Sequence, residues 1–135
     1  MNWKNANITE MNPKRLLLAE DDQMLASLLK YRLEVGGYQV DLALDGRAVK
    51  SYLKGGIPDL VVSDILMPYY SGIELVNFLR DELKSRVPVI MISKADTGSD
   101  PQYLYKLGAD VFIPKPVSPG YLLQKVDELM KRMKS

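Results

Sequence analysis

A short apolar run followed by a helix-like stretch occurs five times between Lys14 and the end of the chain. Most of these runs lack polar alternation, which is typical of strands buried on both faces of a sheet. Strands that alternate with helices favour a parallel sheet with helices on both faces. The sequence therefore predicts an α/β fold of the (βα)5 type, with a doubly wound five-stranded parallel sheet. The predicted strands are 15–19, 38–43, 60–64, 87–92 and 111–113, of which the second alternates like an edge strand.

Capping residues and glycines predict where the helices begin and end. The predicted starts are Asp22, Asp45 with Gly46, the capping-box sequence from Ser71 to Glu74, Asp100 with Pro101, and Ser118 with Pro119. The predicted stops are the glycine pairs 36–37 and 55–56, and Gly108. We expect the third helix to reach about Lys84. The apolar stripes predicted to face the core are Leu25, Leu28, Leu29 and Leu33 in the first helix, Ala48, Val49, Tyr52 and Leu53 in the second, and Leu122, Val126, Leu129, Met130 and Met133 in the last.

Length and composition limit the possible functions. The 135 residues suffice for one domain, which we assign to residues 14–135, with residues 1–13 as a flexible tail. The absence of cysteine and histidine excludes a disulfide scaffold, a Ser-His-Asp triad and a histidine-ligated zinc site. A net charge of +1 disfavours direct nucleic-acid binding. No apolar run is long enough to span a bilayer, and the N-terminus has no signal-peptide pattern.

Polar side chains stand at the ends of four predicted strands. Glu20 and Asp21 follow the first strand, and Asp64 ends the third. Ser93 follows the fourth strand, and Lys115 comes soon after the fifth. The carboxyl ends of parallel strands meet at one rim, so we expect these residues to lie together. Three neighbouring carboxylates need a proton or a cation, and an all-oxygen site of this kind is typical of Mg²⁺.

The same residues have simpler structural interpretations. Asp22 is expected to cap the first helix rather than to bind metal. Asp64 could cap the turn before Pro68, and the other members could be solvated loop acids, a strand-end hydroxyl and a surface lysine. Their joint occurrence at four strand ends favours a functional site.

Four short motifs, in this order and spacing, resemble those of response-regulator receiver domains of two-component signalling, over residues 14 to about 134. The motifs are LLLAEDD at 16–22, the phosphoacceptor sequence VVSDILMP at 61–68 with Gly72, Ser93 at the Ser/Thr position, and an ending formed by GAD at 108–110 with Lys115 and Pro116. The family that the chain resembles includes chemotaxis regulators. The resemblance implies a flavodoxin-like three-layer sandwich with strand order 2-1-3-4-5.

The resemblance also implies a phosphoacceptor and its metal. Asp64 would be the nucleophile that takes a phosphoryl group from a partner's phosphohistidine or from a small phosphodonor. Asp21 and Asp64 would bind Mg²⁺ directly, with Mn²⁺ as a possible substitute. The backbone carbonyl of Leu66 would be a further ligand, and Glu20 would act mostly through water.

The resemblance further implies a switch. Lys115 would offset phosphoryl charge, with a cis bond before Pro116 holding it inward, and Ser93 would donate a hydrogen bond to a phosphoryl oxygen. Ser93 would then shift, and Phe112, which lacks the usual hydroxyl, would turn inward. The face formed by the fourth helix, the fifth strand and the fifth helix would change its contacts with a downstream protein. On that face, Tyr103, Tyr105 and Tyr121 are candidate contacts or plain packing residues.

The leading interpretation is a cytoplasmic, phosphorylation-dependent switch without independent enzyme activity. Its partners would be a sensor histidine kinase or phosphotransfer protein and a downstream protein, with no direct contact to nucleic acid or membrane. One alternative is an aspartate-nucleophile phosphohydrolase, in which a second acid would stand at the position of Leu66. The other is a pseudo-receiver that binds partners without phosphorylation, although the intact acidic set and Lys115 argue against it.

Several residues depart from the family pattern. Lys94 stands beside the site, where a small residue is usual. Tyr69 and Tyr70 are bulky in the loop after the phosphoacceptor, and they could pack, gate the site or touch a partner. Leu66 and Ala95 cannot hold a water through their side chains, so we expect slow self-dephosphorylation.

Overall fold

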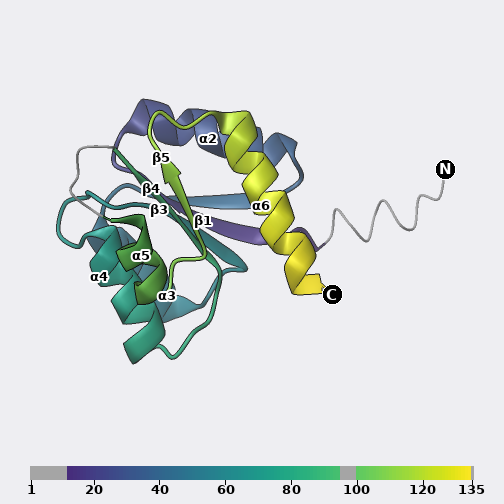
Figure 1. Ribbon diagram of the computed structural model, residues 1–135. Helices are drawn as coiled ribbons and strands as arrows, with labels where there is room; N and C mark the ends of the chain where they lie inside the picture. The colour runs from purple at the N-terminus through teal and green to yellow at the C-terminus, as the bar shows by residue number, and fades with distance from the viewer. Residues whose placement is uncertain (1–11, 95–99, 135) are drawn as a thin grey trace.

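The computed structural model describes residues 12–94 and 100–134, in which five parallel strands form one sheet in the order β2-β1-β3-β4-β5 (Figure 1). This order confirms the predicted doubly wound topology, because the chain runs from β1 to one edge and then crosses to the other. The predicted tail lies outside the described residues except for Asn12 and Pro13. The strands are β1 (Arg15–Ala19), β2 (Gln39–Ala43), β3 (Leu60–Asp64), β4 (Val89–Ser93) and β5 (Val111–Pro114).

Helices cover both faces of the sheet, as the alternation of strands and helices predicts. α2 and α6 lie side by side on one face, and α3, α4 and α5 lie on the other (Figure 1). The helices are α2 (Gln23–Val35), α3 (Gly46–Gly55), α4 (Gly72–Asn77), the π-helix η1 (Phe78–Glu82), α5 (Pro101–Leu107) and α6 (Pro119–Lys134). None of these described helices is long and apolar enough to cross a membrane.

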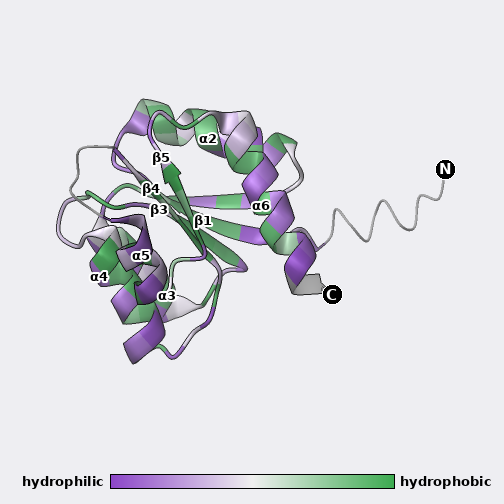
Figure 2. Ribbon diagram, viewed as in Figure 1, coloured by the Kyte–Doolittle hydropathy of each residue, from purple (hydrophilic) through white to green (hydrophobic). Residues whose placement is uncertain are grey.

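Side chains of the central strands point alternately into two cores. In β1, Leu16 and Leu18 belong to the core under α2 and α6, whereas Leu17 and Ala19 belong to the opposite core. Every residue of β3 and β4 is buried, and the strands at the centre of Figure 2 are largely green. Burial on both faces explains why these strands lack polar alternation. The α6 stripe packs as predicted through Leu122, Val126, Leu129 and Met130, while the side chain of Met133 lies outside the described part.

The helix starts expected from the sequence are confirmed. The side chains of Asp22, Asp45 and Ser71 accept hydrogen bonds from N–H groups three residues further on, at 3.1, 2.8 and 3.1 Å. Glu74 completes the capping box by accepting from the Ser71 N–H at 3.1 Å. The remaining caps are Asp100 and Ser118. Each cap satisfies an otherwise unpaired N–H group at the start of its helix.

The buried face of α2 differs from the prediction. Ala26, Leu29 and Leu33 are buried, whereas Leu28 is 56% exposed and Leu25 is only partly buried. The sequence has apolar residues on two sides of this helix, so its periodicity is compatible with either orientation. Packing against α6 and the sheet decides between them.

Three smaller expectations are also wrong. β4 begins at Val89 rather than at residue 87, because Pro88 has no N–H group for the sheet ladder. The helix expected to reach Lys84 changes into η1 at Phe78 and ends at Glu82. In α3, Ala48 is exposed, and the glycine at its N-terminus is buried instead.

Candidate functional site

The carboxyl ends of the strands bring the predicted residues to one edge of the sheet. Glu20 follows β1, Asp64 ends β3 and Lys115 follows β5. These three residues line a cavity of about 290 Å³ together with Asp21, Asp22, Leu66 and Lys94. Ser93 ends β4 and is fully buried, with its Oγ donating to the Lys94 carbonyl at 3.1 Å.

Lys115 is the central cation of this cavity. Its Nζ lies 2.7 Å from Asp64 Oδ2 and 3.1 Å from Glu20 Oε1. The bond between Lys115 and Pro116 is cis, and the Lys115 N–H donates to the Ser93 carbonyl at 2.7 Å. Burial by itself would lower the pKa of Lys115, but the hydrogen bonds and charges of the two acids raise that pKa by more. The lysine therefore remains cationic beside the carboxylates.

Glu20 is a carboxylic acid in an unfavourable environment. Its side chain is only 1% exposed, and this loss of hydration raises the pKa of Glu20 above the ordinary range. The hydrogen bond from the Asp22 N–H to Oε2, at 3.1 Å, opposes that shift, as does the charge of Lys115, whereas the charge of Asp64 adds to it.

The acidic side chains have the composition and placement of a divalent-cation site. Glu20, Asp21 and Asp64 each offer an oxygen atom, and these atoms lie within 4.8 Å of one another. With Asp22 and Lys94 counted, the cavity is lined by four acids and two lysines, so acidic groups exceed basic groups by two. Glu20 Oε1 has no hydrogen-bond partner among the described residues, although the Lys115 ammonium is near. An all-oxygen site with excess negative charge fits Mg²⁺ or Mn²⁺, and it does not fit a metal that prefers nitrogen or sulfur.

The family comparison agrees with this geometry. Residues 16–127 match the family model described as the response regulator receiver domain. The chain belongs to the response regulator receiver domain family. Receiver domains are signalling switches of two-component systems, so the resemblance expected from the motifs is confirmed.

Curated relatives of this receiver domain include two transcriptional regulators. It is 34% identical over 119 residues to the alkaline phosphatase synthesis transcriptional regulatory protein PhoP of Bacillus subtilis, covering 88% of this chain and 49% of that protein. It is 35% identical over 125 residues to the phosphate regulon transcriptional regulatory protein PhoB of Rhizobium meliloti, covering 92% of this chain and 55% of that protein. The chain thus spans about half the length of these relatives.

Solved structures also resemble this receiver domain. A Francisella response regulator receiver domain is 32% identical with a TM-score of 0.83, and the match covers 89% of this chain and 98% of that one. A CheY-like receiver domain from Methanospirillum hungatei is 28% identical with the same TM-score, covering 91% and 98%. These neighbours confirm the flavodoxin-like fold of chemotaxis regulators that the motifs imply.

The predicted site residues occupy different positions relative to the cavity. Leu66 and Lys94 are exposed at its rim, and Asp22 caps α2 as expected while also lining the cavity. Phe112 is half-buried on β5, against the core under α4 and α5. Ala95, on which part of the lifetime prediction depends, lies outside the described residues.

Sequence reasoning missed two features near the site. One is a pair of cations on α3, Arg47 and Lys50, which lie over the rings of Tyr69 and Tyr70. The sequence signal is a pair of basic residues three apart, just after the Asp45 cap. The other is a row of exposed apolar side chains on α2, which are Met24, Leu28, Tyr31 and Val35.

The excess negative charge predicts that the site destabilises the metal-free protein. Asp64→Asn should raise the free energy of unfolding without metal by about 1 kcal/mol, because it removes one of three crowded carboxylates. The same change should reduce the stabilisation that saturating Mg²⁺ gives the parent protein. Urea denaturation with MgCl₂ or with EDTA measures both effects. The matched control is Asp81→Asn, the same change at an exposed acid, and equal behaviour of the two variants would contradict the prediction.

Proposed function

We propose that this receiver domain is a phosphorylation-dependent switch in which Asp64 accepts a phosphoryl group. The observation that carries the proposal is the position of the Asp64 carboxylate, which is buried at the strand ends, lines the acidic cavity and lies 2.7 Å from Lys115 Nζ. A carboxylate oxygen of Asp64 attacks phosphorus in line, and a new oxygen–phosphorus bond forms. The bond from phosphorus to the donor's nitrogen or oxygen breaks, and the donor atom keeps the electron pair.

The neighbouring residues support this transfer by position and charge. Lys115 places an ammonium group where phosphoryl oxygens would arrive, and it also holds Asp64 in place. Ser93 would turn its hydroxyl from the Lys94 carbonyl toward a phosphoryl oxygen. Asp21, Asp64 and the Leu66 carbonyl would hold Mg²⁺, with Glu20 binding through water. Bound Mg²⁺ would neutralise charge on the phosphoryl oxygens.

The alternatives have less support. A hydrolase of the aspartate-nucleophile type would place a second acid at the position of Leu66, which is an exposed apolar residue at the cavity rim. A pseudo-receiver would not need three converging carboxylates and a cationic Lys115 at the strand ends. The family consists of signalling switches, and we expect no independent enzyme activity of this chain.

We further propose that the phosphodonor docks on α2. Its exposed apolar row, defined as Met24, Leu28, Tyr31 and Val35, has spacings of four, three and four residues. At 3.6 residues per turn, the row lies on the side of the helix opposite the buried Ala26, Leu29 and Leu33. This heptad spacing suits packing against a helix of another protein. The row begins two residues after Asp22, which lines the cavity, so a docked helix would lie near the phosphoacceptor.

The output surface that we propose is the face formed by α5, β5 and α6. Tyr103, Tyr105 and Tyr121 are each about half exposed there, as expected for residues available to a partner. Phe112 is half-buried on β5 and pairs in register with Met91 of β4. A shift of Ser93, at the end of β4, would therefore be transmitted to the next strand and to this face.

Three further properties stay predictions: the location of the protein in the cell, its contact with nucleic acid and the lifetime of the phosphoryl group on Asp64. We expect a cytoplasmic protein, and we expect this chain to bind no nucleic acid directly, in keeping with its net charge of +1. The relatives named as transcriptional regulators are about twice as long, and their whole-protein activities are not assigned to this chain. Slow self-dephosphorylation is still expected, because Leu66 at the rim cannot orient a water.

Phosphorylation at Asp64 is the primary test. Incubation with acetyl phosphate and MgCl₂ should add one phosphoryl group, seen by intact mass, and the adduct should be absent without Mg²⁺. Asp64→Asn should abolish the adduct, whereas Asp21→Ala should mainly raise the Mg²⁺ concentration required, because the nucleophile remains. An adduct that persists in Asp64→Asn would overturn the assignment.

Docking on α2 predicts a selective loss of transfer from a protein donor. The test uses a histidine kinase that phosphorylates the parent protein. Leu28→Glu should make this phosphorylation slower by about tenfold or more, since the variant places a charge in an apolar contact. Labelling by acetyl phosphate should be unchanged. Ser27→Glu adds the same charge to an exposed position off the row and is the matched control. Equal slowing by both variants would reject the row as the docking surface.

The output proposal predicts a change around Phe112. Beryllofluoride with Mg²⁺ stands in for the phosphoryl group, and its binding should shift the amide resonances of Phe112 and of neighbouring β5 residues. Lys115→Met should abolish the shifts, because it removes the ammonium group by which the residue after β5 contacts Asp64 and Glu20. An unchanged Phe112 environment in the parent protein would defeat the switch.

A further inference from the structure

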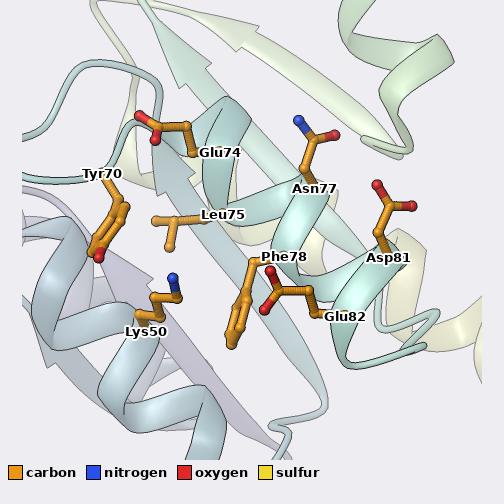
Figure 3. Close-up of a pocket in the computed structure, with 8 residues that line it drawn as sticks. All are labelled: Lys50, Tyr70, Glu74, Leu75, Asn77, Phe78, Asp81 and Glu82. Atoms are coloured by element: carbon orange, nitrogen blue, oxygen red, sulfur yellow. The ribbon is translucent and has the colours of Figure 1, made fainter.

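The loop from Ile65 to Ser71 is held against α3 by contacts between cations and aromatic rings. The Arg47 guanidinium lies 3.8 Å from the centre of the Tyr69 ring. Lys50 Nζ lies 4.5 Å from the Tyr70 ring and 4.9 Å from the Phe78 ring of η1. Figure 3 shows Lys50 reaching from α3 toward the space between Tyr70 and Phe78, in a cavity of about 290 Å³. Each such contact attracts by charge, so the loop is attached without deep burial.

Tyr69 has a backbone conformation that a tyrosine rarely adopts. Its φ is 73°, in the left-handed region that favours glycine. The side chain is 62% exposed, so core packing does not hold the residue in this conformation. The stacked Arg47 is a contact that can do so. Strained residues that the surrounding structure maintains are often found at functional sites.

The backbones of α3 and the loop also meet directly. The Gly46 N–H donates to the Pro68 carbonyl at 3.0 Å, and the Tyr70 N–H donates to the same carbonyl at 3.0 Å. A Cβ atom on Gly46 would lie only 2.2 Å from the Tyr70 carbonyl oxygen, so only glycine allows this approach. The first turn of α3 and the loop therefore form one packed unit.

We propose that Arg47 and Lys50 are positioning residues for the metal-binding loop. The loop contains Leu66, whose carbonyl is a metal ligand in the function proposed above, and the inference rests on that function. Both cations lie outside the set of residues that line the acidic cavity. They act through Tyr69 and Tyr70, by fixing the loop in the conformation that presents the Leu66 carbonyl.

A positioning role and simple electrostatics predict opposite changes in Mg²⁺ affinity when Arg47 or Lys50 is replaced. Arg47 and Lys50 are cations, and removing a cation near an acidic site strengthens Mg²⁺ binding if charge alone matters. Removing a residue that positions a ligand weakens Mg²⁺ binding, because the loop must then be ordered when the metal binds. The direction of the change in Mg²⁺ affinity therefore separates the two effects.

The first experiment measures Mg²⁺ affinity of the full chain by titration of the site's amide resonances. Arg47→Gln and Lys50→Gln should each weaken binding by about three- to tenfold. Lys54→Gln removes the same charge from an exposed position one turn further along α3 and should leave affinity unchanged or slightly tighter. Unchanged or tighter binding in both test variants would overturn the proposal.

The second experiment tests the Arg47–Tyr69 stack by a double-mutant cycle. Tyr69→Gly adopts the left-handed conformation without strain but has no ring, so it should weaken Mg²⁺ binding about as much as Arg47→Gln. The double variant should be no weaker than either single variant, because both changes remove one contact. Additive losses would show that Arg47 does not act through Tyr69.

A metal-free measurement separates failure of this inference from failure of the proposed function. Hydrogen exchange of the Gly46 and Tyr70 N–H groups, both bonded to Pro68, should be faster in Arg47→Gln and Lys50→Gln than in Lys54→Gln. If these amides exchange as slowly as in the control, Arg47 and Lys50 do not fix the loop, even if Mg²⁺ binds. A different outcome is that the parent protein does not bind Mg²⁺ while these amides exchange faster in the variants. That outcome would refute the proposed function of the site and the role of Arg47 and Lys50 in metal binding. It would still show that the two cations fix the loop.

Discussion

The contact of one lysine with two buried carboxylates is the interaction on which the functional edge depends. Lys115 Nζ lies 2.7 Å from Asp64 Oδ2 and 3.1 Å from Glu20 Oε1, and a third carboxylate, Asp21, lies beside them. Buried charges are unfavourable unless they are paired, and one ammonium group cannot neutralise two buried carboxylates together with the exposed Asp21. This edge of the sheet thus keeps an excess of negative charge. The excess favours binding of a divalent cation and lowers the stability of the metal-free protein.

The two apolar cores hold the strand ends together despite this repulsion. Every residue of β3 and β4 is buried, and β1 contributes leucines to both cores. A strand could move away from its charged neighbours only by exposing apolar surface, at about 25 cal/mol per Å². The sheet therefore acts as a rigid support, and conformational change is more easily confined to loops and outer side chains, such as those that follow β3.

The surfaces around the edge are organised by different forces. The row on α2 is apolar and exposed, and a partner helix would remove it from water. The loop after β3 is attached to α3 by cations on aromatic rings and by the shared Pro68 carbonyl. The first surface suits recognition of a phosphodonor, and the second suits control of a metal ligand. Tyr70 packs against the core, while Tyr69 stacks on Arg47, so the two tyrosines differ in role.

The sequence by itself determined the fold class, the helix caps and the candidate acids, because these depend on local patterns. Apolar runs specify buried strands, Asp22 and Ser71 cap helices through nearby N–H groups, and acids at strand ends must meet in a parallel sheet. Only the tertiary structure decided which side of α2 is buried, since apolar residues occur on two sides of that helix. It alone placed Arg47 over Tyr69, because contacts between distant segments depend on how whole elements pack, which no local pattern encodes.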